Sequence, residues 1–332
     1  MSSLSTCKFS ILELAPIHDC GTPQLALKHA LDLAKHAENL GYHRFWVAEH
    51  HNMAGIASSA TAVLLGYLAA NTQTLRLGSG GIMLPNHAPL VVAEQFGTLA
   101  TLYPERIELG LGRAPGTDQY TMRALRRGHQ ETEDQFPRDV LEILSYFDDA
   151  KPQQRITAVP GQGTHVPVYL LGSSLFSAQL AARLGLPYAF ASHFAPRMMM
   201  QAIALYRENF QPSAYLDTPY VILGVPCIVA STDAEANYLA TTLQQRILSL
   251  LRGQPIKLAP PVDTMDGLWN ASERLGVENF LGVAKIGSPH SVKTQLTEFL
   301  AQTQADELIF TCDMYDPEKR LESFRLLMEL KS

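Results

Sequence analysis

The 332-residue chain has few charged residues and only four cysteines, and both scarcities restrict what it can be. Charged residues make up 17% of the chain and hydrophobic residues 46%, a composition that excludes global disorder. The 26 basic residues are outnumbered by 32 acidic ones, so a net charge of −6 argues against nucleic-acid binding or a polybasic membrane contact. No cysteine has C-x-x-C spacing to another, which excludes the pattern of a zinc knuckle or redox dithiol. We therefore expect buried, reduced thiols in a cytoplasmic protein.

The chain also lacks segments typical of membrane insertion. Met1–Glu13 contains one lysine and no long apolar stretch, so we expect no signal peptide. Ala54–Leu75 carries no charged residue, but it is rich in Ala, Ser, Thr and Gly rather than in large apolar residues. We interpret this segment as a buried helix followed by a turn, and we expect no contact with a membrane.

Short β-rich runs alternate with helical runs along the chain. The predicted strands are mostly apolar, which is typical of parallel strands covered on both faces. The first helix has clear ends, with Thr22 as N-cap, Pro23 at its first position and Gly41 as its stop. Eight β-then-α units are predicted: Lys8–Leu14 and Pro23–Leu40; Arg44–Ala48 and Ser58–Ala70; Leu75–Leu84 and Leu90–Leu102; Ile107–Gly112 and Phe136–Phe147; Val166–Leu171 and Leu175–Leu184; Tyr188–Ala191 and Pro196–Asn209; Tyr220–Ala230 and Ala234–Leu251; Glu307–Cys312 and Asp316–Leu330.

Eight such units favour a closed (β/α)₈ TIM barrel of the α/β class over an open doubly wound sheet. No shift in composition marks a linker, so residues 1–332 are predicted to form one domain. A long polar loop, Ala114–Gln135, follows the fourth strand. An insertion, Arg252–Gly287, precedes the last strand and leads into a helical pattern over Ser288–Gln302. Long irregular loops in compact domains are often functional lids, so Arg252–Ala271 is a candidate mobile lid.

The active site of such a barrel lies at the C-terminal ends of its strands, and residues suited to chemistry follow several of them. After the second strand, His50 and His51 are adjacent and must point in different directions, so at most one faces the barrel mouth. One interpretation is structural: that histidine pairs with Glu49 and so fixes the loop. The other is functional: it acts as an acid, a base or a substrate anchor. A metal site is a third interpretation, but neither H-x-H nor H-E-x-x-H accompanies it. After the third strand, Gly78–Gly81 either forms a bulge or lets a flat ligand approach closely.

Further along, the strand ends offer groups suited to an anion. Arg113 lies in a glycine-rich turn whose spacing is not that of a dinucleotide fingerprint. Its guanidinium is suited to a phosphate, and a surface salt bridge is the alternative. Ser174 and its neighbours open the next helix, where they either bind a phosphate or simply cap the helix. Ser192–His193, after the sixth strand, is a second pocket candidate with a structural alternative.

At these positions the sequence resembles the bacterial luciferase-like, flavin-dependent monooxygenase family, and it is most similar to uncharacterised single-chain bacterial members. The resemblance implies a (β/α)₈ barrel that uses FMN, supplied in reduced form by a separate flavin reductase. It also implies that O₂ forms a C4a-peroxyflavin, which oxygenates a small organic substrate, and that homodimers are common. Five stretches carry the resemblance: Phe45–Asn52, Leu75–Leu99, Arg106–Gly116, Val168–Phe194 and Lys285–Val292.

The same resemblance assigns roles to individual residues. By motif, His50 matches the catalytic histidine, and Gly80–Gly81 matches a non-prolyl cis peptide beneath the flavin ring. Ser173 replaces the acidic residue of the luciferase α-type pattern. His51 and His193 are predicted to line the substrate pocket, and no metal ligands are predicted. The predicted cofactor site comprises Gly80, Gly81, Arg113, Ala114, Ser173, Ser174 and Ser177.

Three other functions stay open from the sequence. An F420-dependent oxidoreductase would use the same fold, and F420 shares with FMN a tricyclic ring and a phosphate. A flavin-binding protein without turnover is a second alternative, against which His50 argues. A metal-dependent barrel hydrolase is the third.

Overall fold

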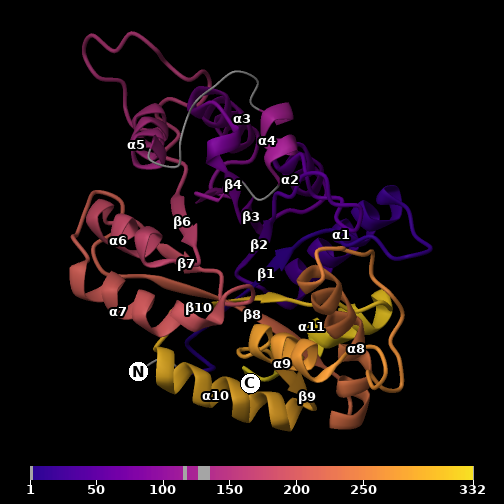
Figure 1. The fold of residues 1–332 in the computed structure, drawn as a ribbon. Helices are drawn as coiled ribbons and strands as arrows, with labels where there is room; N and C mark the ends of the chain where they lie inside the picture. Colours follow the sequence, from indigo (N-terminus) through magenta and orange to yellow (C-terminus); the bar gives the residue numbers. More distant parts are fainter. Residues whose placement is uncertain (1–2, 115–117, 126–134, 332) are drawn as a thin grey trace.

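The computed structural model describes residues 3–114, 118–125 and 135–331. Eight parallel strands close into a barrel, and helices surround them on the outside (Figure 1). Strand β10 closes the ring by pairing with both β1 and β8, which confirms the predicted fold. The strands follow in this order around the ring: β1 (Lys8–Glu13), β2 (Arg44–Val47), β3 (Arg76–Ser79), β5 (Ile107–Gly112), β6 (Val168–Gly172), β7 (Tyr188–Phe190), β8 (Val221–Val229) and β10 (Glu307–Thr311).

Eight helices complete the repeating units, and their bounds agree closely with the predicted ones. The Thr22 hydroxyl accepts a hydrogen bond from the Leu25 amide, and Gly41 ends the helix in the left-handed region at φ 77°, as its position predicts. Helices α2 to α5 cover one side of the barrel, and α8 to α11 cover the opposite side (Figure 1). The eight helices are α1 (Pro23–Leu40), α2 (Thr61–Ala70), α3 (Pro89–Leu102), α5 (Phe136–Phe147), α6 (Leu175–Leu184), α7 (Met199–Asn209), α8 (Asp233–Leu251) and α11 (Pro317–Glu329).

The third predicted strand is not continuous. It ends at Ser79, and a cis peptide joins Gly80 to Gly81 before β4 (Ile82–Met83) pairs with β5. A short 3₁₀ helix, η1 (Leu84–Asn86), follows. The apolar run over Leu75–Leu84 therefore contains two short strands, because the chain turns at the glycine pair between them.

The insertion before the last strand contains more structure than predicted. The helical pattern over Ser288–Gln302 is confirmed as α10 (Pro289–Thr303). Helix α9 (Ala271–Phe280) and strand β9 (Lys285–Gly287) were missed, and β9 pairs with the end of β8. An Asn270–Glu273 capping box starts α9, a signal present in the sequence.

Several smaller predictions are settled by the fold. Within the described ranges, no helix is both long and apolar enough to cross a bilayer. Of the predicted loop Ala114–Gln135, only Ala114, 118–125 and Gln135 are described, and 119–125 forms helix α4 (Gln119–Leu125); the rest lies outside the described residues. A 3₁₀ turn, η3 (Pro196–Met198), precedes α7. Cys20 is exposed, which corrects the expectation that all the thiols are buried.

The barrel interior contains a buried ionic network below the strand ends. Arg44 lies 2.7 Å from Glu108 through Nη1 and 2.8 Å from Glu307 through Nε, and the side chains of all three are at most 2% exposed. The Tyr220 hydroxyl donates to Glu307 over 2.7 Å. Trp46 links this network to the barrel mouth, because its Nε1 donates to Glu108 over 3.0 Å while its side chain lines the cavity above. The network thus fixes the floor of the site.

Candidate active site

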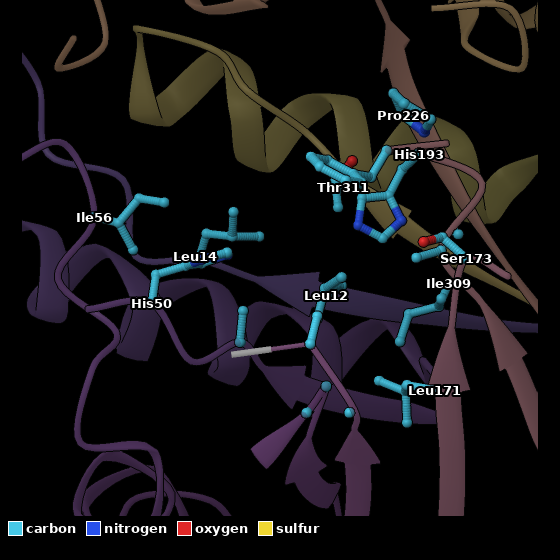
Figure 2. A pocket seen from close by; sticks show the side chains of 18 of the residues that line it. Leu12, Leu14, His50, Ile56, Leu171, Ser173, His193, Pro226, Ile309 and Thr311 are labelled. Atoms are coloured by element: carbon cyan, nitrogen blue, oxygen red, sulfur yellow. The ribbon is translucent and has the colours of Figure 1, made fainter. Parts of the chain in front are cut away.

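A cavity of about 430 Å³ opens at the C-terminal ends of the barrel strands. Its lining is mainly apolar with a few polar groups, which is typical of sites for small molecules and cofactors. Figure 2 shows His50, Leu14 and Ile56 along one side of the opening, and His193, Ser173 and Thr311 along the other.

The floor of the cavity is formed partly by the cis pair Gly80–Gly81, as the family resemblance implied. A Cβ atom on Gly80 would lie 2.6 Å from Leu12 Cδ1, and one on Gly81 would lie 2.8 Å from the Gly110 carbonyl oxygen. Position 81 therefore requires glycine, because the close contact is with backbone, whereas a side chain at position 80 would have to displace Leu12. The glycine pair offers a surface free of side chains to a flat ligand.

Arg113 lies beside the N-terminus of helix α6. Its guanidinium carbon is 4.3 Å from the centroid of the Phe176 ring, and Phe176 belongs to the first turn of that helix. This cation–π contact holds a positive group next to the free N–H groups of a helix start. Phe176 was missed from the sequence, although its position three residues after Ser173 places it in the predicted anion site.

The serines of α6 lie at the same candidate anion site. Ser174 is the N-cap, yet among the described residues its side chain makes no capping hydrogen bond, so its hydroxyl is available to a ligand. Ser177 is buried, and its Oγ would lie 2.3 Å from a Cβ on Gly172. The structure brings Arg113, Ser174 and Ser177 to one cavity, whose lining also includes Ala114 and Ser173.

His50 lies just past β2 and lines the cavity. Its backbone N–H donates to the Ser58 carbonyl over 3.0 Å, which fixes the loop after β2. Its position at the cavity wall is suited to contact with a ligand above the glycine floor.

His51, in contrast, is not among the described residues that line the cavity, so its prediction as a substrate-pocket residue is not supported by its position. Glu49 Oε1 accepts hydrogen bonds over 2.8 Å from Nε2 of both His51 and His87. Glu49 Oε2 accepts from the Met83 amide over 3.2 Å. Because adjacent residues point in opposite directions, the turn that aims His50 at the cavity aims His51 at Glu49.

These three side chains form a clamp between the ends of β2 and β4. Hydrogen bonds from the histidines lower the pKa of buried Glu49 to about 2, against an opposing effect of burial. Their ligand atoms lie within 4.8 Å of one another, close enough to hold a metal ion as well. An ionised carboxylate can only accept, so Nε2 of each histidine is assigned as the donor, and the trio is held together by these hydrogen bonds.

His193 lies after β7 and lines the cavity, as predicted. Its ring rests on Gly224 of β8, where a Cβ would lie 2.1 Å from Nδ1. Burial, with a smaller effect of nearby His50, lowers the pKa of His193 to about 4, against an opposing effect of Asp313. His193 is therefore neutral at pH 7.

Other lining residues come from segments that sequence reasoning did not assign to the site. Arg246 on α8 and Asp313 after β10 form an ion pair with 2.6 Å between Nη1 and Oδ2. Pro255 and Ile256 of the candidate lid also line the cavity, and a Cβ on Gly55 would lie 2.5 Å from the Ile256 carbonyl oxygen. The segment thus closes against the loop after β2, while its mobility stays a prediction.

This arrangement defines a class of protein: a barrel enzyme whose cavity combines a candidate anion site, a flat glycine floor and a histidine. The comparison with known proteins then identifies the family. Residues 8–307 match the family model described as Luciferase-like monooxygenase. A relative from Escherichia coli (strain K12), described as a luciferase-like monooxygenase, is 54% identical over 326 residues, which are 98% of this chain and 97% of that one. The chain belongs to the luciferase-like monooxygenase family and is an oxidoreductase.

Other relatives agree with this assignment. The N-acetyl-S-alkylcysteine monooxygenase of Bacillus subtilis (strain 168) is 45% identical over 189 residues, 55% of this chain and 56% of that one. The solved structure of apo-MsnO8 superposes with a TM-score of 0.91 at 37% identity, covering 98% of each chain. Two more distant structures share the fold alone. The oxygenating constituent of 3,6-diketocamphane monooxygenase from Pseudomonas putida, in complex with FMN, superposes with a TM-score of 0.71 at 16% identity and covers 97% of each chain. An F420-dependent secondary alcohol dehydrogenase superposes with a TM-score of 0.72 at 14% identity and covers 98% of this chain and 99% of that one.

Proposed function

We propose that the chain is an FMN-dependent monooxygenase that uses reduced flavin and O₂ to oxygenate a small organic substrate. The observation that carries this proposal is the anion site at α6 beside the glycine floor. Arg113, held by Phe176, and the free hydroxyl of Ser174 are suited to the FMN phosphate. The backbone of Gly80–Gly81 offers a flat surface to the isoalloxazine ring.

The residues around the cavity have separate roles in this proposal. When bound, reduced FMN supplies the electrons that activate O₂ for transfer of one oxygen atom to the substrate. His50 holds or donates a proton at the cavity wall, and the apolar lining excludes water. We expect a separate flavin reductase to supply reduced FMN, as the family resemblance implies.

Titration under anaerobic conditions tests the choice of cofactor. Reduced FMN and reduced F420 are each added to the protein, with an unrelated barrel protein as control, and binding is measured by absorbance. Tighter binding of reduced FMN than of F420 supports the proposal. Preference for F420 would assign the chain to F420-dependent oxidoreductases, and no binding of either would overturn a flavin-type function. The FMN-loaded protein is then exposed to ¹⁸O₂ with a substrate panel, and one ¹⁸O atom is expected in the product.

We also propose a homodimer formed through helices α2 and α3. Large apolar side chains stand exposed on these neighbouring helices: Val63 is 75% exposed and Leu102 63%, and Tyr67 and Val91 are nearly half exposed. Such a patch is typical of a protein interface. Light scattering is expected to show a dimer for the wild type and a monomer for Val63→Glu. A monomeric wild type would contradict this part of the proposal.

A further inference from the structure

The cavity has a second polar end, formed by Arg246 and Asp313. In the ring of eight strands, Arg113 follows β5 and Asp313 follows β10, and these two strands lie four places apart. Four places in a ring of eight is the opposite side of the barrel. Arg246 reaches this second end from α8, the helix that follows β8, the neighbour of β10. The cavity therefore has one charged site on each side of its glycine floor.

The guanidinium at this end is paired with Asp313, but the contact is not aligned as a hydrogen bond. Arg246 Nη1 is buried and lies 2.6 Å from Asp313 Oδ2, yet it has no partner with hydrogen-bond geometry among the described residues. The side chains of Arg246 and Asp313 are only 18% and 15% exposed. The pair is held by charge attraction and lacks the aligned hydrogen bonds that stabilise a buried ion pair, so a ligand oxygen aligned with the guanidinium would add a directed, charge-assisted hydrogen bond.

The surroundings of this pair are apolar. Leu243, Ile247 and Leu250 line the cavity from the same face of α8 as Arg246, since residues three and four apart share a helix face. Ile256 and Phe280 extend this apolar wall. A ligand held at Arg246 would therefore need an apolar tail beside its polar group.

His193 is a further polar group near the pair. His193 is neutral at pH 7 and lies close enough to Asp313 and His50 for both to affect its protonation. Asp313 itself is an acceptor, so the ligand group that faces it must donate a hydrogen bond. The second end thus offers a cation and an anion side by side, and it fits a group that presents an acceptor and a donor together.

We propose that Arg246 and Asp313 anchor the substrate, and that the substrate is an N-acylated amino acid. Its carboxylate binds the Arg246 guanidinium, its amide N–H donates to Asp313, and its acyl chain lies along the apolar face of α8. This inference rests on the proposed function, because it assigns the FMN phosphate to the opposite end of the cavity.

Binding of a matched probe series tests the anchor without turnover. Calorimetry with oxidised-FMN-loaded protein measures N-hexanoylglycine, its methyl ester, and N-hexanoylsarcosine, which lacks the N–H. The ester and the sarcosine derivative are each expected to bind at least about tenfold more weakly than the acid. Equal binding of acid and ester, or no binding of the acid, would overturn the proposal.

Variants separate the roles of the two residues. Arg246→Gln is expected to abolish the preference for the acid over the ester. Asp313→Ala removes the acceptor oxygen and is expected to abolish the preference for the glycine over the sarcosine derivative. Arg252→Gln is the matched control, because Arg252 pairs with Glu273 over 2.8 Å and does not line the cavity. Thermal unfolding checks that each variant is folded. If a variant fails to fold, the probe series on the wild type still tests the proposal.

FMN titration of the same variants separates this proposal from the proposed function. Arg246→Gln is expected to bind FMN as the wild type does. If this variant loses FMN, or if N-hexanoylglycine competes with FMN, Arg246 holds the cofactor and the substrate anchor is wrong. If FMN fails to bind the wild type, the proposed function is wrong. Binding of the probe series to the protein without FMN then still tests whether Arg246 and Asp313 anchor an N-acylated amino acid.

Discussion

Replacing Arg113 with alanine removes the one guanidinium that Phe176 holds at the start of α6. A hydrogen bond to a charged group contributes about 1.5–3 kcal/mol, and Arg113 supplies such a bond to the FMN phosphate in our proposal. The dissociation constant of FMN should therefore rise about tenfold to 150-fold. Arg113→Lys keeps the charge but loses the planar fork and much of the stacking on Phe176, so we expect an intermediate loss.

The assay is quenching of FMN fluorescence on titration with protein. Arg183→Ala is the matched control, because Arg183 lies exposed in the last turn of the same helix, at the end away from the anion site. Its affinity for FMN should equal that of the wild type. If Arg113→Ala binds FMN within twofold of the wild type, the phosphate lies elsewhere and the argument from the helix start is refuted.

Three further predictions concern other parts of the site. His50→Ala should bind FMN normally but oxygenate substrate about 10²-fold more slowly in a steady-state assay; full activity would return His50 to a structural role. Glu49 has a folded pKa near 2 against an ordinary value of 4.5, so its ionised form stabilises the fold above about pH 4.5 and loses this effect as pH falls towards 2. Urea unfolding should show the advantage of wild type over Glu49→Gln narrowing across that range, and a constant difference would contradict the clamp. Arg44→Met should lower the free energy of unfolding by about 3–5 kcal/mol, since it leaves Glu307 buried without its cation and Glu108 with only the longer 3.4 Å contact to Arg76; a change below about 1 kcal/mol would refute this.

The sequence was sufficient to predict the barrel, because each of its eight units has its own local signals. The helix over Pro23–Leu40 has its cap, its proline and its terminal glycine in the expected places, and it forms with those bounds. Location at the strand ends likewise predicted that Arg113, Ser174, His50 and His193 would share one cavity, because barrel topology alone brings these ends together.

What could not be predicted depends on the direction of single side chains and on the insertion. His50 and His51 have the same chemistry, and only the backbone turn after β2 shows which one faces the cavity. In the sequence, Arg246 is one of several polar residues on a long predicted helix. Its partner Asp313 lies 67 positions later, so no local sequence pattern predicts that the two residues pair.

The crystal structure of the protein with FMN bound tests the central claim most directly, because the cavity has a cationic group at each end. We predict that the phosphate lies between Arg113 and the N-terminus of α6, with the isoalloxazine ring over Gly80–Gly81. A phosphate bound at Arg246 instead would contradict both the cofactor site and the substrate anchor.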